Sequence, residues 1–268
     1  MKALMFVTTI AVAAPAAQAA DGVLILEKTA SGGTTRTHQI QIEKDRMRAE
    51  TTGAGGEKQA MVFDGAKQVM WIINYDKKTY TEMTKADADR LGGQMTDAMA
   101  KMQQQLQNLP PEQRAKIEAM MAGRGGMRGA GPGAGTKTEY KKTGTDTVGK
   151  WTCDKYEGSQ NGQKTSELCT VDPQALGFTA ADFEVSRQLQ AVFAKLVPNG
   201  AEDLFRIGTG QDQGFTGVPV RRVSFGPTPT TSEITAVTRQ SFSEATFAVP
   251  EGFEKQASPF GGRGRGGR

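Results

Sequence analysis

The residues of this sequence that could carry out chemistry are few. There is a single histidine, His38. A metal site made of several imidazoles is therefore excluded, and a hydrolytic triad would have to use this one residue. His38 shares a strand face with Ile40 and Ile42 in an alternating run, which favours a structural role. We predict no catalytic residue and no enzymatic activity, and a hydrolase built around His38 is the hypothesis that the sequence favours least.

The two cysteines of the chain, Cys153 and Cys169, form an even pair, which in an oxidising compartment most simply means a disulfide with each other. Their surroundings are those of a β-hairpin. If residues 160–162 form a three-residue loop with a bulge, Cys153 faces Cys169 and Lys155 faces Glu167. The sequence therefore predicts a local Cys153–Cys169 disulfide.

Three methionines, Met95, Met99 and Met102, recur on one face of an expected helix. Thioethers are soft ligands that suit Cu(I), so a methionine-rich copper-binding protein is one hypothesis. The other is that these side chains fill a core or line an adaptable apolar groove. We favour the core or groove and predict neither a metal site nor a cofactor.

The elements that must position these residues begin with a group of strands. Short β-prone runs between residues 22 and 83 are separated by tight turns, which permits antiparallel neighbours only. A helix then starts at Thr84 as N-cap, and its stripe of Leu and Met must cover the inner face of that sheet. The residues predicted to line the resulting groove are Trp71, Ile73, Leu91, Met95, Met99, Met102 and Leu106.

The second half of the chain repeats this order. Strands resume at 138–142 and 148–157, and Thr179 is expected to cap a second helix. Residues 218–225 and 233–240 read as a final antiparallel pair, with 247–250 as a short edge.

Three segments are predicted to lie outside the core. Residues 1–20 have the layout of a secretory signal peptide, with a positive start, a short apolar stretch and a cleavage site near Ala19-Ala20. Residues 123–135 contain seven glycines and form an insert, and residues 258–268 form a disordered Gly/Arg tail. The net charge of +4 derives from the arginines of these two stretches and Lys2, so nucleic acid is not an expected partner. For the tail we expect weak contact with the membrane or envelope surface, or a role in solubility alone.

Several segments together resemble a group of exported bacterial domains of unknown function. They are residues 43–48, 61–65, 77–84, 109–114, 149–156 and 247–253. Those domains are similar to the lipoprotein-localisation carriers (LolA/LolB-like), and the resemblance covers most of residues 22–256. It implies a curved antiparallel sheet, an unclosed half-barrel, with helices covering its concave face. It implies no active site.

The predictions therefore combine into one α+β domain over residues 21–257, with a curved antiparallel sheet whose concave face is covered by helices. We expect an exported, periplasmic or secreted, non-enzymatic binding protein. Its partner would be a hydrophobic group such as an acyl chain, or an envelope protein. A closed core without any ligand is the alternative that the same apolar residues allow.

Overall fold

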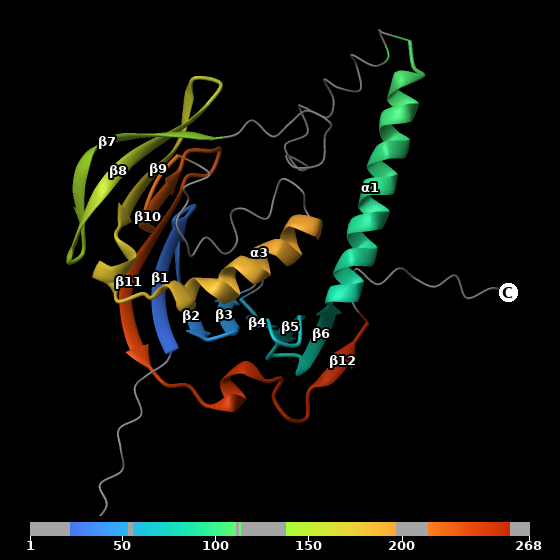
Figure 1. Ribbon diagram of the computed structural model, residues 1–268, viewed down its shortest axis with the longest axis horizontal. Helices are drawn as coiled ribbons and strands as arrows, with labels where there is room; N and C mark the ends of the chain where they lie inside the picture. Colours follow the sequence, from blue (N-terminus) through green and yellow to red (C-terminus); the bar gives the residue numbers. More distant parts are fainter. Residues whose placement is uncertain (1–21, 53–55, 111–112, 114–137, 197–213, 258–268) are drawn as a thin grey trace, which may run out of the picture.

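The computed structural model describes residues 22–52, 56–110, 113, 138–196 and 214–257. In these residues it shows one curved sheet with helices α1 and α3 and three short 3-10 segments (Figure 1). The sheet has twelve strands in the order β12-β6-β5-β4-β3-β2-β1-β11-β10-β9-β8-β7. The predicted signal peptide, glycine-rich insert and Gly/Arg tail all lie outside the described residues.

The strands are β1 (Gly22–Ser31), β2 (Thr34–Glu43), β3 (Arg46–Thr52), β4 (Lys58–Asp64), β5 (Val69–Asn74), β6 (Thr79–Thr84), β7 (Glu139–Val148), β8 (Trp151–Gln160), β9 (Gln163–Val171), β10 (Val218–Ser224), β11 (Thr230–Gln240) and β12 (Glu254–Gln256). The helices are α1 (Lys85–Gln107) and α3 (Glu184–Leu196), and the 3-10 segments are η1 (Pro173–Leu176), η2 (Ala180–Phe183) and η4 (Glu244–Phe247).

Strands β1 to β6 form the antiparallel meander that the turn spacing predicts. The connections at Lys44 and Lys78 adopt the left-handed conformation, with φ of 50° at both residues. One strand was not anticipated. The sequence predicts strands at 38–42 and 60–63 and none between them, whereas the structure has β3 at Arg46–Thr52, because the two arginines that flank Met47 conceal its alternation.

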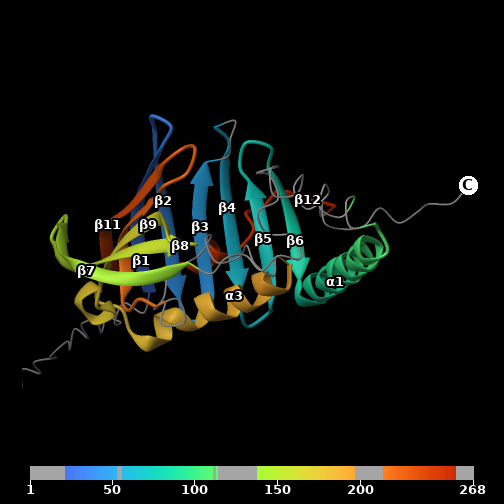
Figure 2. The ribbon, with the colours of Figure 1, turned by 90° about the horizontal axis from the view of Figure 1, so that it is seen from above.

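Helix α1 begins where the sequence predicts. The Thr84 hydroxyl accepts from the Asp87 backbone N–H at 3.2 Å, and the Asp87 carboxylate accepts from the Thr84 N–H at 3.2 Å. This reciprocal pair is a capping box, which satisfies two N–H groups of the first turn. From the end of β6 the helix points away from the sheet, and it contacts α3 (Figures 1 and 2). The sequence also predicts that the helix ends at Pro110-Pro111 and restarts over residues 112–121, and this second part lies almost entirely outside the described residues.

The second predicted helix start is also confirmed. Asp182 accepts from the Thr179 backbone N–H at 2.6 Å, and the guanidinium of Arg239 on β11 pairs with the same buried carboxylate. Arg239 also donates to the Gly177 carbonyl at 3.1 Å. This paired charge ties the segment that leads into α3 to strand β11, which fixes the helix over the sheet.

The Cys153–Cys169 disulfide is present, with 5.4 Å between the two Cα atoms. The predicted register is wrong by two residues. The hairpin loop holds two residues, Asn161 and Gly162, both with positive φ, and a bulge near Gly158 sets Lys155 opposite Cys169. The disulfide still forms because a register shift of two residues leaves both cysteines on the same face of the sheet, whereas a shift of one would place them on opposite faces.

The C-terminal segment differs from the prediction as well. The expected edge strand at 247–250 is wrong, because this stretch contains the end of η4, where Phe247 is buried. The edge of the sheet is instead β12, which pairs with β6 in parallel. A parallel partner is available here because β12 is distant in sequence from β6.

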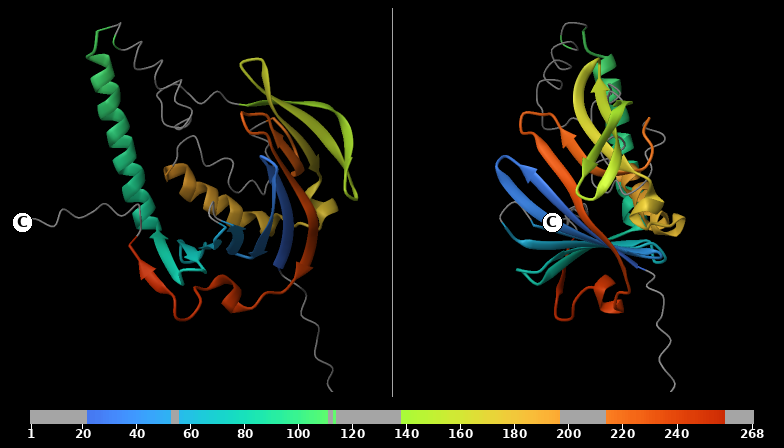
Figure 3. Two further views of the ribbon diagram at one scale, coloured as in Figure 1. Left: turned by 180° about the vertical axis from the view of Figure 1, so that it is seen from behind. Right: turned by 90° about the vertical axis from the view of Figure 1, so that its left-hand side faces the viewer.

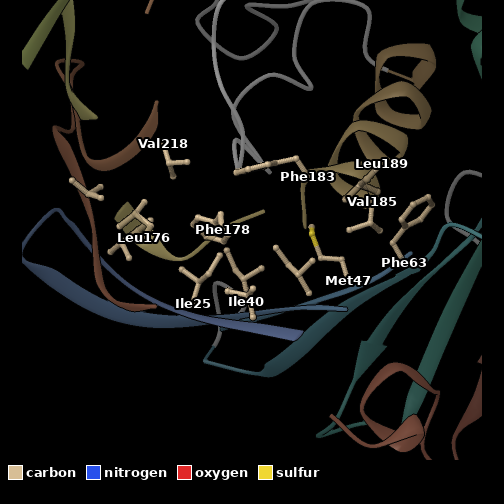
Figure 4. Packing of buried hydrophobic residues seen from close by; sticks show 14 of the residues in the cluster. Ile25, Ile40, Met47, Phe63, Leu176, Phe178, Phe183, Val185, Leu189 and Val218 are labelled. Carbon is tan, nitrogen blue, oxygen red and sulfur yellow. The ribbon is translucent and has the colours of Figure 1, made fainter. Parts of the chain in front are cut away.

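The α+β class and the curved, predominantly antiparallel sheet agree with the prediction. The described side chains of α3, η1 and η2 pack on one face of the sheet, which we call the inner face (Figure 4). The C-terminal segment with η4 lies on the opposite, outer face (Figure 3). Of the described side chains of α1, only Ala88 and Leu91 join the inner cluster, so α1 does not lie across the sheet as the sequence analysis expects.

Loss of the disulfide should lower stability without changing the fold. The bond joins residues 16 positions apart, which corresponds to about 3 kcal/mol in the loop-entropy model. We expect the Cys153→Ser/Cys169→Ser double variant to unfold at lower denaturant concentration by this order of free energy, with an unchanged circular dichroism spectrum. A double variant with wild-type stability would contradict the prediction.

Two glycines offer a matched test of how α3 and α1 are held. A Cβ on Gly65 would lie 2.1 Å from the Gln188 Oε1 atom of α3 and 3.0 Å from the Asp45 carbonyl oxygen, whereas a Cβ on Gly93 of α1 meets nothing within 4 Å. The Gln188 side chain can move aside whereas the Asp45 carbonyl oxygen cannot, so Gly65→Ala should cost about 1 kcal/mol in urea unfolding. Gly93→Ala should raise stability by up to about 1 kcal/mol, because alanine favours a helix. Equal effects of the two substitutions would show that the turn at Gly65 has room for a side chain.

Candidate functional site

The inner face of the sheet is organised in rows of side chains that run across the strands. Directly paired residues of antiparallel neighbours point to the same face, so the strand registers give each row. The first row is Val23, Ile42, Met47, Phe63, Met70 and Met83. The second row is Val237, Ile25, Ile40, Ala49, Met61, Ile72 and Thr81. The two rows form an apolar band across β1 to β6.

Helix α3 covers the first row. Val185 and Leu189 are fully buried, and Figure 4 shows them beside Phe63 and Met47. The Ser186 hydroxyl donates to the Met47 thioether at 3.8 Å, which places the helix directly over this strand. The first row is therefore closed core.

The second row becomes more exposed toward β5. Ile25 is 1% exposed, Ile40 and Met61 are each 9% exposed, and Ile72 is 37% exposed. Phe178 lies over Ile25 and Ile40 in Figure 4, which accounts for the closed end. We call the other end of the row, made of Ala49, Met61, Ile72 and Thr81, the inner strip. Ile72 is its exposed side chain, Ala49 and Thr81 are half-buried, and Met61 is buried.

A polar row borders this apolar band. On β3 to β6 it consists of Thr51, Gln59, Asn74 and Thr79, which face one another across the paired strands. On β1 and β2 it continues with Glu27 opposite His38. His38 thus lies at the polar margin of the inner face, half-buried.

The predicted groove residues do not form one group. Trp71 and Ile73 point to the outer face, where they pack with Val62 and Phe247. Leu91 packs into the inner cluster on the other side of the sheet. A single groove lined by these residues is therefore not what the structure shows. The reason is alternation, since it is Met70 and Ile72, and not their neighbours Trp71 and Ile73, that face inward.

The remaining predicted residues lie along α1. Met102 is half-buried and Leu106 is 8% exposed, but neither belongs to the inner cluster. The side chains of Met95 and Met99 lie outside the described part of the structure, so the proposed thioether site has no described geometry. Among the described residues no group of three or more His, Cys, Asp or Glu side chains could hold a metal ion.

The methionines that do face inward are not among the site residues predicted from the sequence. Met47, Met61, Met70 and Met83 lie on four successive strands and all belong to the inner cluster. Strand alternation at Met61 and Phe63 is the signal that could have found them. Their flexible side chains line the inner face of the sheet, where they can change rotamer.

The outer face is closed by residues 242–256, which we call the C-terminal strap. Its aromatic side chains Phe242, Phe247 and Phe253 pack around Val62 and Ile73. The strap is held at one end by Arg46, whose guanidinium pairs with Glu244 and lies 4.9 Å from the Phe247 ring centroid.

The buried Arg48 holds the middle of the strap. It donates to the Thr246 carbonyl at 3.1 Å and to Glu50 at 2.9 Å. At the far end Lys255 donates to Glu82 at 2.6 Å, and the Trp71 indole N–H donates to the other oxygen of that carboxylate at 3.0 Å. These bonds to Lys255 and Trp71 hold the pKa of Glu82 below its usual value.

Comparisons with known proteins add little. No protein-family model matches the chain, and no curated protein matches it. Among solved structures, an uncharacterized conserved protein from Thermus thermophilus has a TM-score of 0.44 at 9% identity, over 89% of this chain and 91% of that one. PNGF-II has a TM-score of 0.34 at 12% identity, over 88% of this chain and 31% of that one.

A DUF1329 family protein from Desulfovibrio piger has a TM-score of 0.23 at 8% identity, over 87% of this chain and 91% of that one. Two of these neighbours are thus themselves described without a function. All three TM-scores lie below 0.5, and we base no conclusion on them. Within the described residues no helix is long and apolar enough to cross a membrane.

The strap gives a pH prediction. Because the folded-state pKa of Glu82 is lowered, its stabilising contribution is present above the ordinary value of 4.5 and is lost as the pH falls through the folded-state pKa. We expect Glu82→Gln to be less stable than the wild type at pH 7, with a difference that shrinks below about pH 4.5 in urea unfolding. A difference that stays constant down to pH 3 would mean that the charge of Glu82 does not hold the strap.

Proposed function

We propose that this protein is an exported, non-enzymatic binding protein that takes a hydrophobic, acyl-type group on the inner strip. The observation that carries the proposal is the exposure of Ile72. It lies in the same row as Met61, on the face that forms the apolar core, yet 37% of its surface is accessible. A row of core-like residues with an open end is a surface on which an apolar chain can be shielded from water.

The composition of the strip supports an acyl chain as ligand. Met61 and Ile72 are large and apolar, and Ala49 on the neighbouring strand is small, so an unbranched chain can follow the row. Beside the strip, in the first row, lie Met70 and Met83, whose side chains can adjust to a ligand by changes of rotamer. An apolar surface with few polar contacts fits a ligand that varies in length.

Export is part of the proposal. It is supported by the layout of residues 1–20 and by the Cys153–Cys169 disulfide, since disulfides persist chiefly in oxidising compartments. The absence of enzymatic activity is supported by the single histidine of the sequence and by its place at the margin of the sheet, opposite Glu27. The alternative ligand is an apolar segment of an envelope protein that occupies the same strip. The experiment below distinguishes this ligand from an acyl chain.

The test compares the two large apolar side chains that are most exposed in the described structure, Ile72 at 37% and Phe225 at 43%. Ile72→Asp places a charge on the inner strip and should weaken binding of a fluorescent fatty acid at least tenfold, which corresponds to about 1.4 kcal/mol. Phe225→Asp, on the loop after β10, is the matched control and should leave the dissociation constant unchanged. Fluorescence titration of both variants measures this.

Two outcomes would contradict the proposal. If the wild-type protein binds neither the fluorescent fatty acid nor its amide, an acyl ligand is wrong and an envelope protein becomes the partner to search for. If Ile72→Asp and Phe225→Asp bind as well as the wild type, the site is elsewhere. Circular dichroism of each variant confirms that the fold is retained.

A further inference from the structure

The border of the inner strip carries hydrogen-bonding groups without charge. On β3 to β6 the polar row consists of Thr51, Gln59, Asn74 and Thr79. The nearest charged residue on the strip side is Glu57, which directly precedes β4, whereas Lys58 at the start of β4 alternates to the outer face. An anionic head group at this border would therefore meet neutral side chains and a negative one.

Gln59 is the residue of this border closest to the apolar strip. It lies two positions before Met61 on β4, on the same face, and is half-buried. Its side-chain amide makes no hydrogen bond to any residue in the described part of the chain, whereas the Asn74 carbonyl oxygen is already used by the Lys77 backbone N–H at 2.9 Å. Gln59 thus offers both a donor and an acceptor beside the strip.

The width of the strip limits what can occupy it. Same-face residues along a strand are about 7 Å apart. The second row is therefore about 7 Å from the closed first row on one side and about 7 Å from the polar border on the other. An α-helix is about 10 to 12 Å across and would have to bury the polar border as well. Three strand spacings from Ala49 to Thr81 give the strip a length of about 14 Å. A narrow strip of this kind fits a single extended chain.

We propose that the ligand is a single acyl or alkyl chain with an uncharged, hydrogen-bonding head group, such as an amide, an ester or an alcohol, and that Gln59 bonds this head group. This inference rests on the proposed function, because it names the ligand class for the same strip. The chain lies across β4 to β6 over Met61 and Ile72, and its polar end turns toward Gln59. A carboxylate of the same chain length binds less well because Glu57 repels it and the four side chains of this border carry no positive charge.

The experiment is a displacement of the fluorescent fatty acid by two competitors of equal chain length, decanamide and decanoate, at pH 8, where decanoate is ionised. With the wild-type protein we expect decanamide to displace the probe at least fivefold more effectively. Gln59→Leu should reduce this ratio to about one. Gln39→Leu, the same change at an exposed position on the outer face of β2, is the matched control and should keep the wild-type ratio.

The outcomes separate this inference from the proposed function. If both competitors displace the probe equally well from the wild-type protein, the head-group preference is wrong while the acyl-binding function stands. If the preference exists but survives in Gln59→Leu, the head group lies elsewhere and the assignment to Gln59 is overturned. If the wild-type protein binds neither the fluorescent fatty acid nor its amide, the proposed function fails and this inference fails with it.

Discussion

The structure depends on one constraint, which is that strands β4 and β5 are apolar on both faces. Met61, Phe63 and Met70 face inward, and Val62 and Ile73 face outward with no exposed surface. A sheet of this kind needs a cover on each side, because apolar area left in water costs about 25 cal/mol per Å². Helix α3 supplies the inner cover and the C-terminal strap supplies the outer one. The outer face is closed, whereas the inner cover leaves the second row open toward β5, and this difference singles out the inner strip.

Local signals in the sequence predicted much of the fold. The turns of the meander, the capping residues Thr84 and Thr179, and the Cys153–Cys169 bond all depend on neighbours in sequence or on a short hairpin, and all agree with the structure. Register depends on the loop type and on bulges, and the two-residue loop at Asn161-Gly162 together with the bulge after Gly158 shifts it by two. The parallel pairing of β12 with β6 joins the far end of the described chain to its first half, and no local pattern encodes such a pairing.

The candidate site could not be predicted for a related reason. In the run Val69 to Ile73 every residue is apolar, so alternation cannot tell which side chains face α3 and which face the strap. Only the position of the strap decides it, and the strap comes from the far end of the chain, held by Arg46, Arg48 and Glu82. The sequence pattern favours the methionines of the helix as candidate site residues, whereas the four described methionines of the inner face lie on strands of the sheet.

A chain that lies on an open strip buries only part of its surface. Since full burial of a methylene is worth about 0.8 kcal/mol and association has its own entropic cost, such a strip favours exchangeable binding over tight retention.

The most direct test of this account is a methyl NMR titration of protein labelled at the methionine methyl groups, with decanamide as the ligand. Met61 lies in the inner strip, and Met47 lies in the first row beneath Ser186 of α3. The account predicts a saturable shift of the Met61 methyl signal, assigned by Met61→Leu, with little change at Met47. A saturable shift confined to the methionines of α1, with none at Met61, would contradict the inner strip as the binding site.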